Sequence, residues 1–173
     1  IKKVSAIVQT QLFGEDIIAS KLDHNDLIAL LAKYAAKLGY GIHIGETEQR
    51  KESNFREISY KMLSPLDYGI DSKAFDIIKE IDILWLKDKR IVAAFEVATS
   101  IETADKPINV RYRNLFVANP VITIKSFVIV KDQDYGKAES KLFTPVNNQE
   151  GLCDKIKLIK TSQMTFENIE KKL

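Results

Sequence analysis

Two carboxylates interrupt a stretch of the chain that otherwise reads as buried strands. Residues 81–100 have the sequence IDILWLKDKRIVAAFEVATS, which predicts a β-hairpin, yet it contains Asp82 and Glu96. If the strands pair antiparallel around residues 88 and 89, the two acids meet at one end of the sheet. Carboxylates held together in an apolar frame repel each other unless a cation lies between them. A divalent cation that prefers oxygen ligands, Mg²⁺ or Mn²⁺, meets this requirement.

A metal bound by these acids indicates a particular chemistry. It can activate water and stabilise the extra negative charge of a phosphodiester transition state. The alternative is that both acids are solvated, outward-facing strand residues. This alternative is weak for Glu96, because its neighbours in AAFEVA are all apolar. A third explanation is an ion-pair network inside the protein, with Arg111 as the cation.

Basic residues gather in two segments although the chain as a whole is nearly neutral. The formal net charge is +2, so no global signature of nucleic-acid binding is present. One segment contains Arg50, Lys51, Arg56 and Lys61, and the other contains Lys106, Arg111 and Arg113. The segments are compatible with a phosphate-binding face, and the plain alternative is solvated surface. The residues expected to contact nucleic acid are Arg50, Lys51, Arg56, Arg111 and Arg113.

The composition sets limits on the class of protein. With 173 residues, 45% hydrophobic and 29% charged, the chain fits one globular domain, residues 1–173. It begins with Ile, which is compatible with a piece of a longer chain. No apolar run is long enough to span a membrane, and no signal peptide is visible. The single cysteine, Cys153, excludes an internal disulfide, and two histidines cannot by themselves form a His-rich metal site. These features predict a cytoplasmic protein.

The periodicity of apolar residues predicts a mixed central β-sheet flanked by helices, an α/β fold. Residues 23–38 form the clearest amphipathic helix, which we expect to pack across the hairpin through Leu27, Leu30, Leu31 and Tyr34. The expected strands are 40–45, 81–86, 91–98, 125–131 and 155–160, the last at an edge of the sheet. Further helices are expected at 72–79, within 107–118, at 135–143 and at 165–173. The polar segment 46–56 is expected to be a loop.

Several segments together resemble the PD-(D/E)xK nuclease superfamily, which has the restriction-endonuclease-like fold. The segments are IDILW (81–85), FEVATSI (95–101), RYRNL (111–115), the Asp23-His24 pair, Gly39-Tyr40, SFVIV (126–130) and LFTP (142–145). They extend over about residues 22 to 165. Asp and Glu at this spacing alone match by chance, and the combination with Trp85 and the arginine-containing helix is more specific.

The resemblance implies a Mg²⁺- or Mn²⁺-dependent DNA endonuclease of a restriction or defence type. Its substrate would be double-stranded DNA, and a homodimer is compatible with it. Asp82 and Glu96 would be metal ligands, joined by the backbone carbonyl of Val97 and by Asp23. Arg111 would face the scissile phosphate. Two alternatives stay open: Asp23 is a helix N-cap, and Arg111 forms an ion pair.

The sequence also departs from the superfamily pattern. Ala98 stands at the third motif position, where the superfamily usually has Lys, and Asn114 stands where the most similar branch has Asp. Either another residue supplies the missing cation, with Lys125, Arg111 and Arg113 as candidates, or the domain no longer cleaves. The second case would leave a nucleic-acid-binding or assembly module on the same fold.

Overall fold

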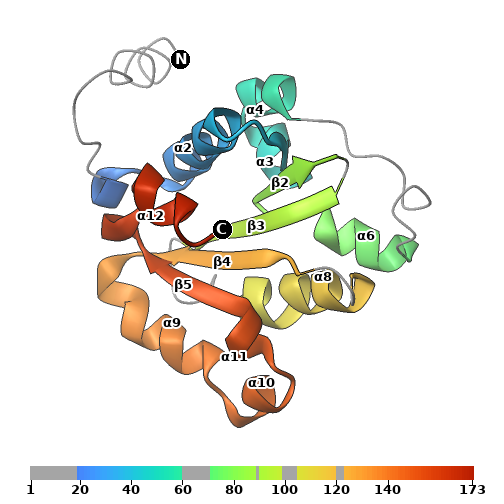
Figure 1. Ribbon diagram of the computed structural model, residues 1–173, viewed down its shortest axis with the longest axis vertical. Helices are drawn as coiled ribbons and strands as arrows, with labels where there is room; N and C mark the ends of the chain where they lie inside the picture. Colours follow the sequence, from blue (N-terminus) through green and yellow to red (C-terminus); the bar gives the residue numbers. More distant parts are fainter. Residues whose placement is uncertain (1–18, 60–70, 89, 99–104, 120–122) are drawn as a thin grey trace.

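The protein is built on a five-stranded mixed sheet (Figure 1). The computed structural model describes residues 19–59, 71–88, 90–98, 105–119 and 123–173. The strands are β1 (Gly41–Ile44), β2 (Ile83–Lys87), β3 (Arg90–Ala98), β4 (Lys125–Val130) and β5 (Ile156–Lys160), in that spatial order. The pairs β1–β2 and β2–β3 are antiparallel, and the pairs β3–β4 and β4–β5 are parallel. The expected mixed sheet is confirmed, with β5 at its edge.

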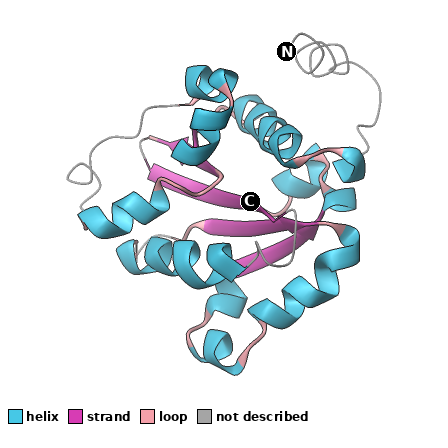
Figure 2. Cartoon of the chain, turned by 180° about the vertical axis from the view of Figure 1, so that it is seen from behind, coloured by secondary structure: helices cyan, strands magenta, loops and turns pink. Residues whose placement is uncertain are grey.

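Helices cover both faces of the sheet, as the front view and the view from behind show (Figure 1, Figure 2). One face packs against α2 (His24–Lys37), α4 (Ser53–Ile58) and α12 (Phe166–Glu170). The other packs against α6 (Ser72–Ile78), a π-helical segment (Pro107–Tyr112) that continues into α8 (Arg113–Ala118), α9 (Tyr135–Leu142) and α11 (Leu152–Lys155). Two short helices, α3 (Glu46–Lys51) and α10 (Pro145–Gln149), lie in connections. Among the described residues, no helix is long and apolar enough to cross a membrane.

The hairpin β2–β3 has the register that the sequence predicts. Ile83 lies opposite Phe95, so the next position back along β2 lies level with Glu96. The register shifts between Trp85 and Leu86, and the tight turn contains Asp88 with a φ of 49°. Aspartate tolerates this left-handed conformation better than most side chains do.

Successive side chains of a strand point to opposite faces, and this separates the two cores. Trp85 and Phe95 are fully buried on the α2 side, with ring centroids 4.6 Å apart. Leu84, Ala94 and Ala98 belong to the core on the α8 side. By the same alternation Glu96 faces the α8 side, toward the segment that contains Arg111.

Helix α2 behaves as its pattern predicts. Leu27, Leu30 and Leu31 are buried against the sheet, and the Tyr34 hydroxyl donates a hydrogen bond to the carbonyl of Met164 at 3.1 Å. Gly39, with a φ of 73°, follows the last turn and permits the left-handed ending for which glycine is suited.

The expectation of a loop at 46–56 is wrong, because this segment forms α3 and α4. Both helices are too short to be stable alone, and tertiary contacts hold them. The Thr47 backbone N–H and hydroxyl donate to the Glu80 carboxylate at 3.1 and 2.6 Å, and Phe55 is buried in the α2-side core.

The C-terminal helix is also shorter than expected. Lys61, the residues 99–101 of the FEVATSI segment and the residues that precede Ala19 lie outside the described residues.

Candidate functional site

Asp82 and Glu96 meet at one end of the sheet, as the hairpin register requires. Glu96 is 1% exposed and Asp82 is 5% exposed. One nitrogen of Arg111, Nη1, donates to both oxygens of Glu96 at 2.9 and 2.7 Å and to Asp82 Oδ1 at 3.3 Å. The cation that the two acids require is therefore supplied, on this side of the pair, by the protein itself.

The π-helical segment Pro107–Tyr112 positions Arg111. Tyr112 is fully buried, and its hydroxyl donates to the Phe127 carbonyl of β4 and lies 3.2 Å from the Ala94 carbonyl of β3. These contacts fix the segment to two adjacent strands. Wide π-helical turns are frequent at functional sites, and here one presents the preceding Arg111 to the acids.

Burial and charge act in opposite directions on this group. Burial raises the pKa of Asp82. Burial and the neighbouring Asp82 raise the pKa of Glu96 well above its usual range, and Arg111 offsets only part of this. Burial alone lowers the pKa of Arg111, but its contacts with Glu96 and Asp82 outweigh this effect and raise it. The guanidinium is therefore a permanent charge, whereas the two acids retain protons more readily than exposed ones do.

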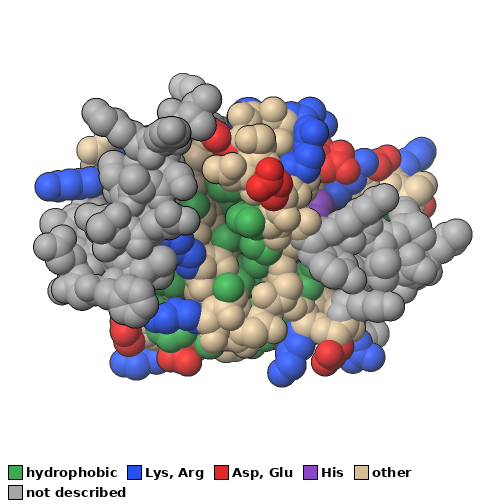
Figure 3. Space-filling model, turned by 90° about the horizontal axis from the view of Figure 1, so that it is seen from above, with side chains coloured by type: hydrophobic (Ala, Val, Ile, Leu, Met, Phe, Trp, Pro, Cys, Tyr) green, Lys and Arg blue, Asp and Glu red, His purple; other side chains and the backbone are tan. Residues whose placement is uncertain are grey.

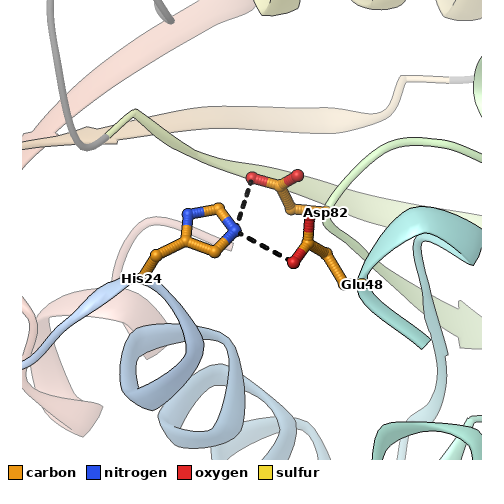
Figure 4. Close-up of side chains that lie close together, drawn as sticks. All are labelled: His24, Glu48 and Asp82. Atoms are coloured by element: carbon orange, nitrogen blue, oxygen red, sulfur yellow. Dashed lines mark ion pairs between the residues drawn. The ribbon is translucent and has the colours of Figure 1, made fainter. Parts of the chain in front are cut away.

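The other oxygen of Asp82 faces a second cluster, formed with His24 and Glu48 (Figure 4). Asp82 Oδ2 accepts a hydrogen bond from the Val97 backbone N–H at 2.8 Å. The Nε2 atom of His24 lies 4.0 Å from this oxygen and 3.6 Å from Glu48 Oε2. The Nδ1 atom of His24 lies 3.0 Å from the Val97 carbonyl, which can only accept, so Nδ1 carries a proton.

Glycine at position 45 brings Glu48 to Asp82. The Gly45 N–H donates to the Asp82 carbonyl at 3.0 Å, and a Cβ at this position would lie 2.9 Å from the carbonyl oxygen of Ile81. Because backbone cannot move aside cheaply, a side chain at 45 would push α3 away from the strand. Helix α3 begins at the next residue, and its third residue is Glu48. Lys51, one turn later, contacts Glu48 Oε1 at 2.9 Å.

The donor atoms of His24, Glu48 and Asp82 could hold a metal ion. They all lie within 4.8 Å of one another, and Glu48 Oε2 is buried without a hydrogen-bond partner. The contact with His24 lowers the pKa of Glu48 to about 2. Burial lowers the pKa of His24, but Glu48 and Asp82 outweigh this and raise it. Without a metal, the proton on Nε2 is the charge that faces the two carboxylates.

Asp23, Val97 and Glu96 have other contacts in the structure than the metal ligation that the resemblance implies. Asp23 caps α2: its carboxylate accepts the Asp26 N–H at 2.8 Å, and the Asp26 side chain reaches back. The Val97 carbonyl contacts His24, and both oxygens of Glu96 accept from Arg111. Neither Asp23 nor Glu96 belongs to the three-donor group found among the described residues.

The basic residues expected at the site divide into two sets. The first set, Arg111 and Lys51, contacts the acids of the site, and the second set lies elsewhere. Arg50 is exposed and contacts Thr47 Oγ1 and Glu80, and Arg56 is exposed on α4. Arg113 contacts Asn147 and Glu150 of the segment 145–150. In the view from above, the described Lys and Arg side chains lie in separate groups with Asp and Glu among them, so they form no continuous basic surface on this face (Figure 3).

Lys125 cannot supply the cation that is missing at the motif position occupied by Ala98. It pairs with Ala93, whereas Glu96 pairs with Val128, three residues further along β4. This separation is about 10 Å along the strand, at about 3.3 Å per residue. Ala98 itself is 3% exposed and contributes only a methyl group to the α8-side core.

A hollow of about 500 Å³ opens beside His24 at the ends of β3 and β4. Leu27, Val97 and Ile129 give it apolar walls, and Lys21 and Lys131 also line it. Its size is within the range of small-ligand pockets, and its charged lining consists of these two lysines and one acid, Asp23.

Sequence reasoning missed the roles of His24 and Glu48. In the sequence, His24 stands out only as part of the Asp23-His24 pair, and Glu48 lies in the segment 46–56, which is expected to be a loop. Glu48 and Asp82 are 34 positions apart, and only the packing of α3 on the strand brings them together. A polar segment directly after a glycine was the single available signal.

The stability of the metal-free protein should depend on pH through His24. Its raised pKa means that the stabilising contribution is complete below its unfolded value of about 6.5 and is lost as pH rises through the folded pKa. We expect the difference in unfolding free energy between wild type and His24→Gln to shrink above pH 6.5, by at most about 1.4 kcal/mol per pH unit. Urea unfolding from pH 5.5 to 9 measures it, and a constant difference would contradict the prediction.

Comparison of the chain with protein-family models, with curated proteins and with solved structures found no match in any of the three. The resemblance to the PD-(D/E)xK nucleases therefore rests on the sequence segments quoted above.

Proposed function

We propose that this domain hydrolyses phosphodiester bonds in DNA with the help of a bound divalent metal ion. The observation that carries the proposal is the position of Asp82. It is buried at the start of a central strand, one oxygen faces Arg111, and the other faces His24 and Glu48. Buried acids with raised pKa values that converge with a histidine beside a hollow mark a candidate catalytic site.

The residues of the site have separable roles in this proposal. Asp82, with its neighbours, would hold the metal ion, which supplies activated water and stabilises the charge of the transition state. Arg111 keeps the side chains of Asp82 and Glu96 in place through its three contacts. Lys21 and Lys131 line the hollow beside His24 and are suited to holding the substrate phosphates.

A non-catalytic nucleic-acid-binding module is the second candidate, and two observations favour it. The methyl group of Ala98 faces the α8-side core on the same side as Glu96, so it can neither orient water nor stabilise charge. Both oxygens of Glu96 accept hydrogen bonds from Arg111, so a metal ion would have to share this carboxylate with the guanidinium.

Incubation with supercoiled plasmid DNA separates the two candidates. The proposal predicts nicked and linear DNA in the presence of Mn²⁺ or Mg²⁺ and none in EDTA. The binding module predicts retarded but intact plasmid under every condition. A parallel incubation with single-stranded RNA identifies the class of nucleic acid. Intact, unretarded DNA in all samples would refute the DNA nuclease, and intact, unretarded RNA in addition would refute the binding module.

A further inference from the structure

We propose that His24, Glu48 and Asp82 form a site for one first-row transition metal ion, bound in preference to Mg²⁺, with Mn²⁺ as its probe. The proposal deepens the proposed function, on which the catalytic meaning of the ion rests. It differs from the ligand set that the resemblance implies, because it includes His24 and Glu48 and excludes Glu96 and Asp23.

The hydrogen bond of His24 prepares its ring for metal binding. Nδ1 donates to the Val97 carbonyl at 3.0 Å, so in the neutral ring the lone pair is on Nε2. Nε2 is the atom that faces the carboxylates of Glu48 and Asp82. Metal-binding histidines almost always donate their other N–H to a carbonyl or carboxylate in this way, which fixes both tautomer and ring orientation.

Glu48 provides a second, independent indication. Glu48 is 6% exposed, one of its carboxylate oxygens contacts Lys51, and the other is buried without a hydrogen-bond partner. A buried oxygen in this state is costly unless a ligand completes it. This oxygen is the one that lies 3.6 Å from His24 Nε2, in the group that also contains Asp82 (Figure 4).

Cations of the protein already lie on one side of each carboxylate of the proposed site. Lys51 contacts Glu48 Oε1, and Arg111 contacts Asp82 Oδ1 and both oxygens of Glu96. Arg111 occupies the Glu96 side of Asp82, so the remaining place for a cation is the side with His24. A metal ion bound there would take the lone pair of Nε2, so a metal ion and a proton compete for this atom.

The chemistry of the donors selects the ion. Mg²⁺ favours oxygen ligands in octahedral geometry and keeps several waters, whereas an imidazole nitrogen suits first-row transition metal ions such as Fe²⁺, Ni²⁺ and Zn²⁺. Mn²⁺ is the weakest binder of this series and serves as the paramagnetic probe. One imidazole and two carboxylates form a mixed ligand set, which binds a first-row transition metal ion more tightly than it binds Mg²⁺. The arrangement has room for one ion, because Arg111 already bridges Asp82 and Glu96.

Electron paramagnetic resonance of Mn²⁺, titrated into the protein without nucleic acid, tests the proposal. We expect one bound Mn²⁺ per chain, displaced by Mg²⁺ only at a concentration at least about 10-fold higher. Spin-echo modulation from a nitrogen nucleus should report the imidazole ligand. His24→Ala should remove this modulation and weaken Mn²⁺ binding at least about 10-fold.

Two matched variants distinguish this site from the one that the resemblance implies. Asp23→Asn removes a carboxylate but retains a side chain that caps α2 equally well, and Glu96→Gln removes the other strand acid. Both should bind Mn²⁺ as wild type does, after circular dichroism has shown that they are folded. Loss of binding in either variant, retention of binding in His24→Ala, or equal affinity for Mg²⁺ and Mn²⁺ would overturn the proposal. The Mn²⁺ titration contains no nucleic acid, so its outcome is independent of the plasmid experiment. A protein that binds Mn²⁺ as expected but does not cleave plasmid DNA would support the metal site and refute only the proposed nuclease function.

Discussion

Arg111→Ala should lower the free energy of unfolding by about 3–5 kcal/mol at pH 7. This is the range for removing one partner of a buried ion pair. The Arg111 side chain is 14% exposed, and its guanidinium contacts two carboxylates that are nearly inaccessible to water. Its loss leaves both acids buried without their cation. Urea denaturation with a comparison of midpoints and slopes measures the effect.

Arg113→Ala is the matched control for this prediction. This variant removes an arginine side chain two residues further along the chain. In its ion pair with Glu150, the Arg113 side chain is about one-third exposed and the Glu150 side chain nearly half exposed. Exposed pairs contribute about 0–1 kcal/mol. The double variant Arg111→Ala/Glu96→Gln should regain part of the lost stability, because one of the uncompensated charges is then absent. Equal losses in the two single variants would show that Arg111 holds no special place in the fold.

Local periodicity explains why the sequence predicts the frame of the site so well. The alternation in IDILWL and IVAAFEVA defines two strands and a tight turn, and the register follows with little freedom. Leu27, Leu30 and Leu31 recur at helical spacing, and each is buried where expected. The meeting of Asp82 with Glu96 follows from the hairpin alone, since all the relevant residues lie within 20 positions of one another.

The remainder of the site depends on contacts that no local pattern encodes. Glu48 reaches Asp82 because Gly45 allows α3 to start against the backbone of Ile81, and because Glu80 accepts two hydrogen bonds from Thr47. A six-residue polar helix has no periodicity strong enough to predict, and tertiary contacts decide its conformation.

The choice between Arg111 as an ion-pair partner and Arg111 as a phosphate contact also required three dimensions. In sequence, the two roles use the same residue in the same helix. The structure places Nη1 within hydrogen-bonding distance of both acids, which supports the ion-pair alternative for the metal-free protein. A phosphate contact by the same side chain would require it to leave Glu96, and burial makes that costly.

Asp82→Asn should reduce metal-dependent DNA cleavage at least about 100-fold, the scale on which a single preorganised electrostatic group acts in a catalytic site. The amide retains the shape of the side chain and an oxygen that can accept the Val97 N–H. It loses the negative charge through which Asp82 would hold a metal ion. The measurement is the rate of plasmid nicking with Mn²⁺ for wild type and variant. Asp76→Asn, which removes a carboxylate that is 68% exposed on α6, is the matched control and should cleave at the wild-type rate.

Binding of duplex DNA by Asp82→Asn should stay equal to that of wild type or become tighter. The substitution removes a negative charge that repels phosphate, and it leaves every lysine and arginine in place. Affinity should fall with salt concentration with the same slope for both proteins, because the slope counts the phosphates that cations neutralise. Cleavage lost together with binding would assign Asp82 to the fold rather than to the chemistry. Cleavage retained at the wild-type rate would move the catalytic centre away from the β2–β3 hairpin, and the acids would then serve only the ion-pair network with Arg111.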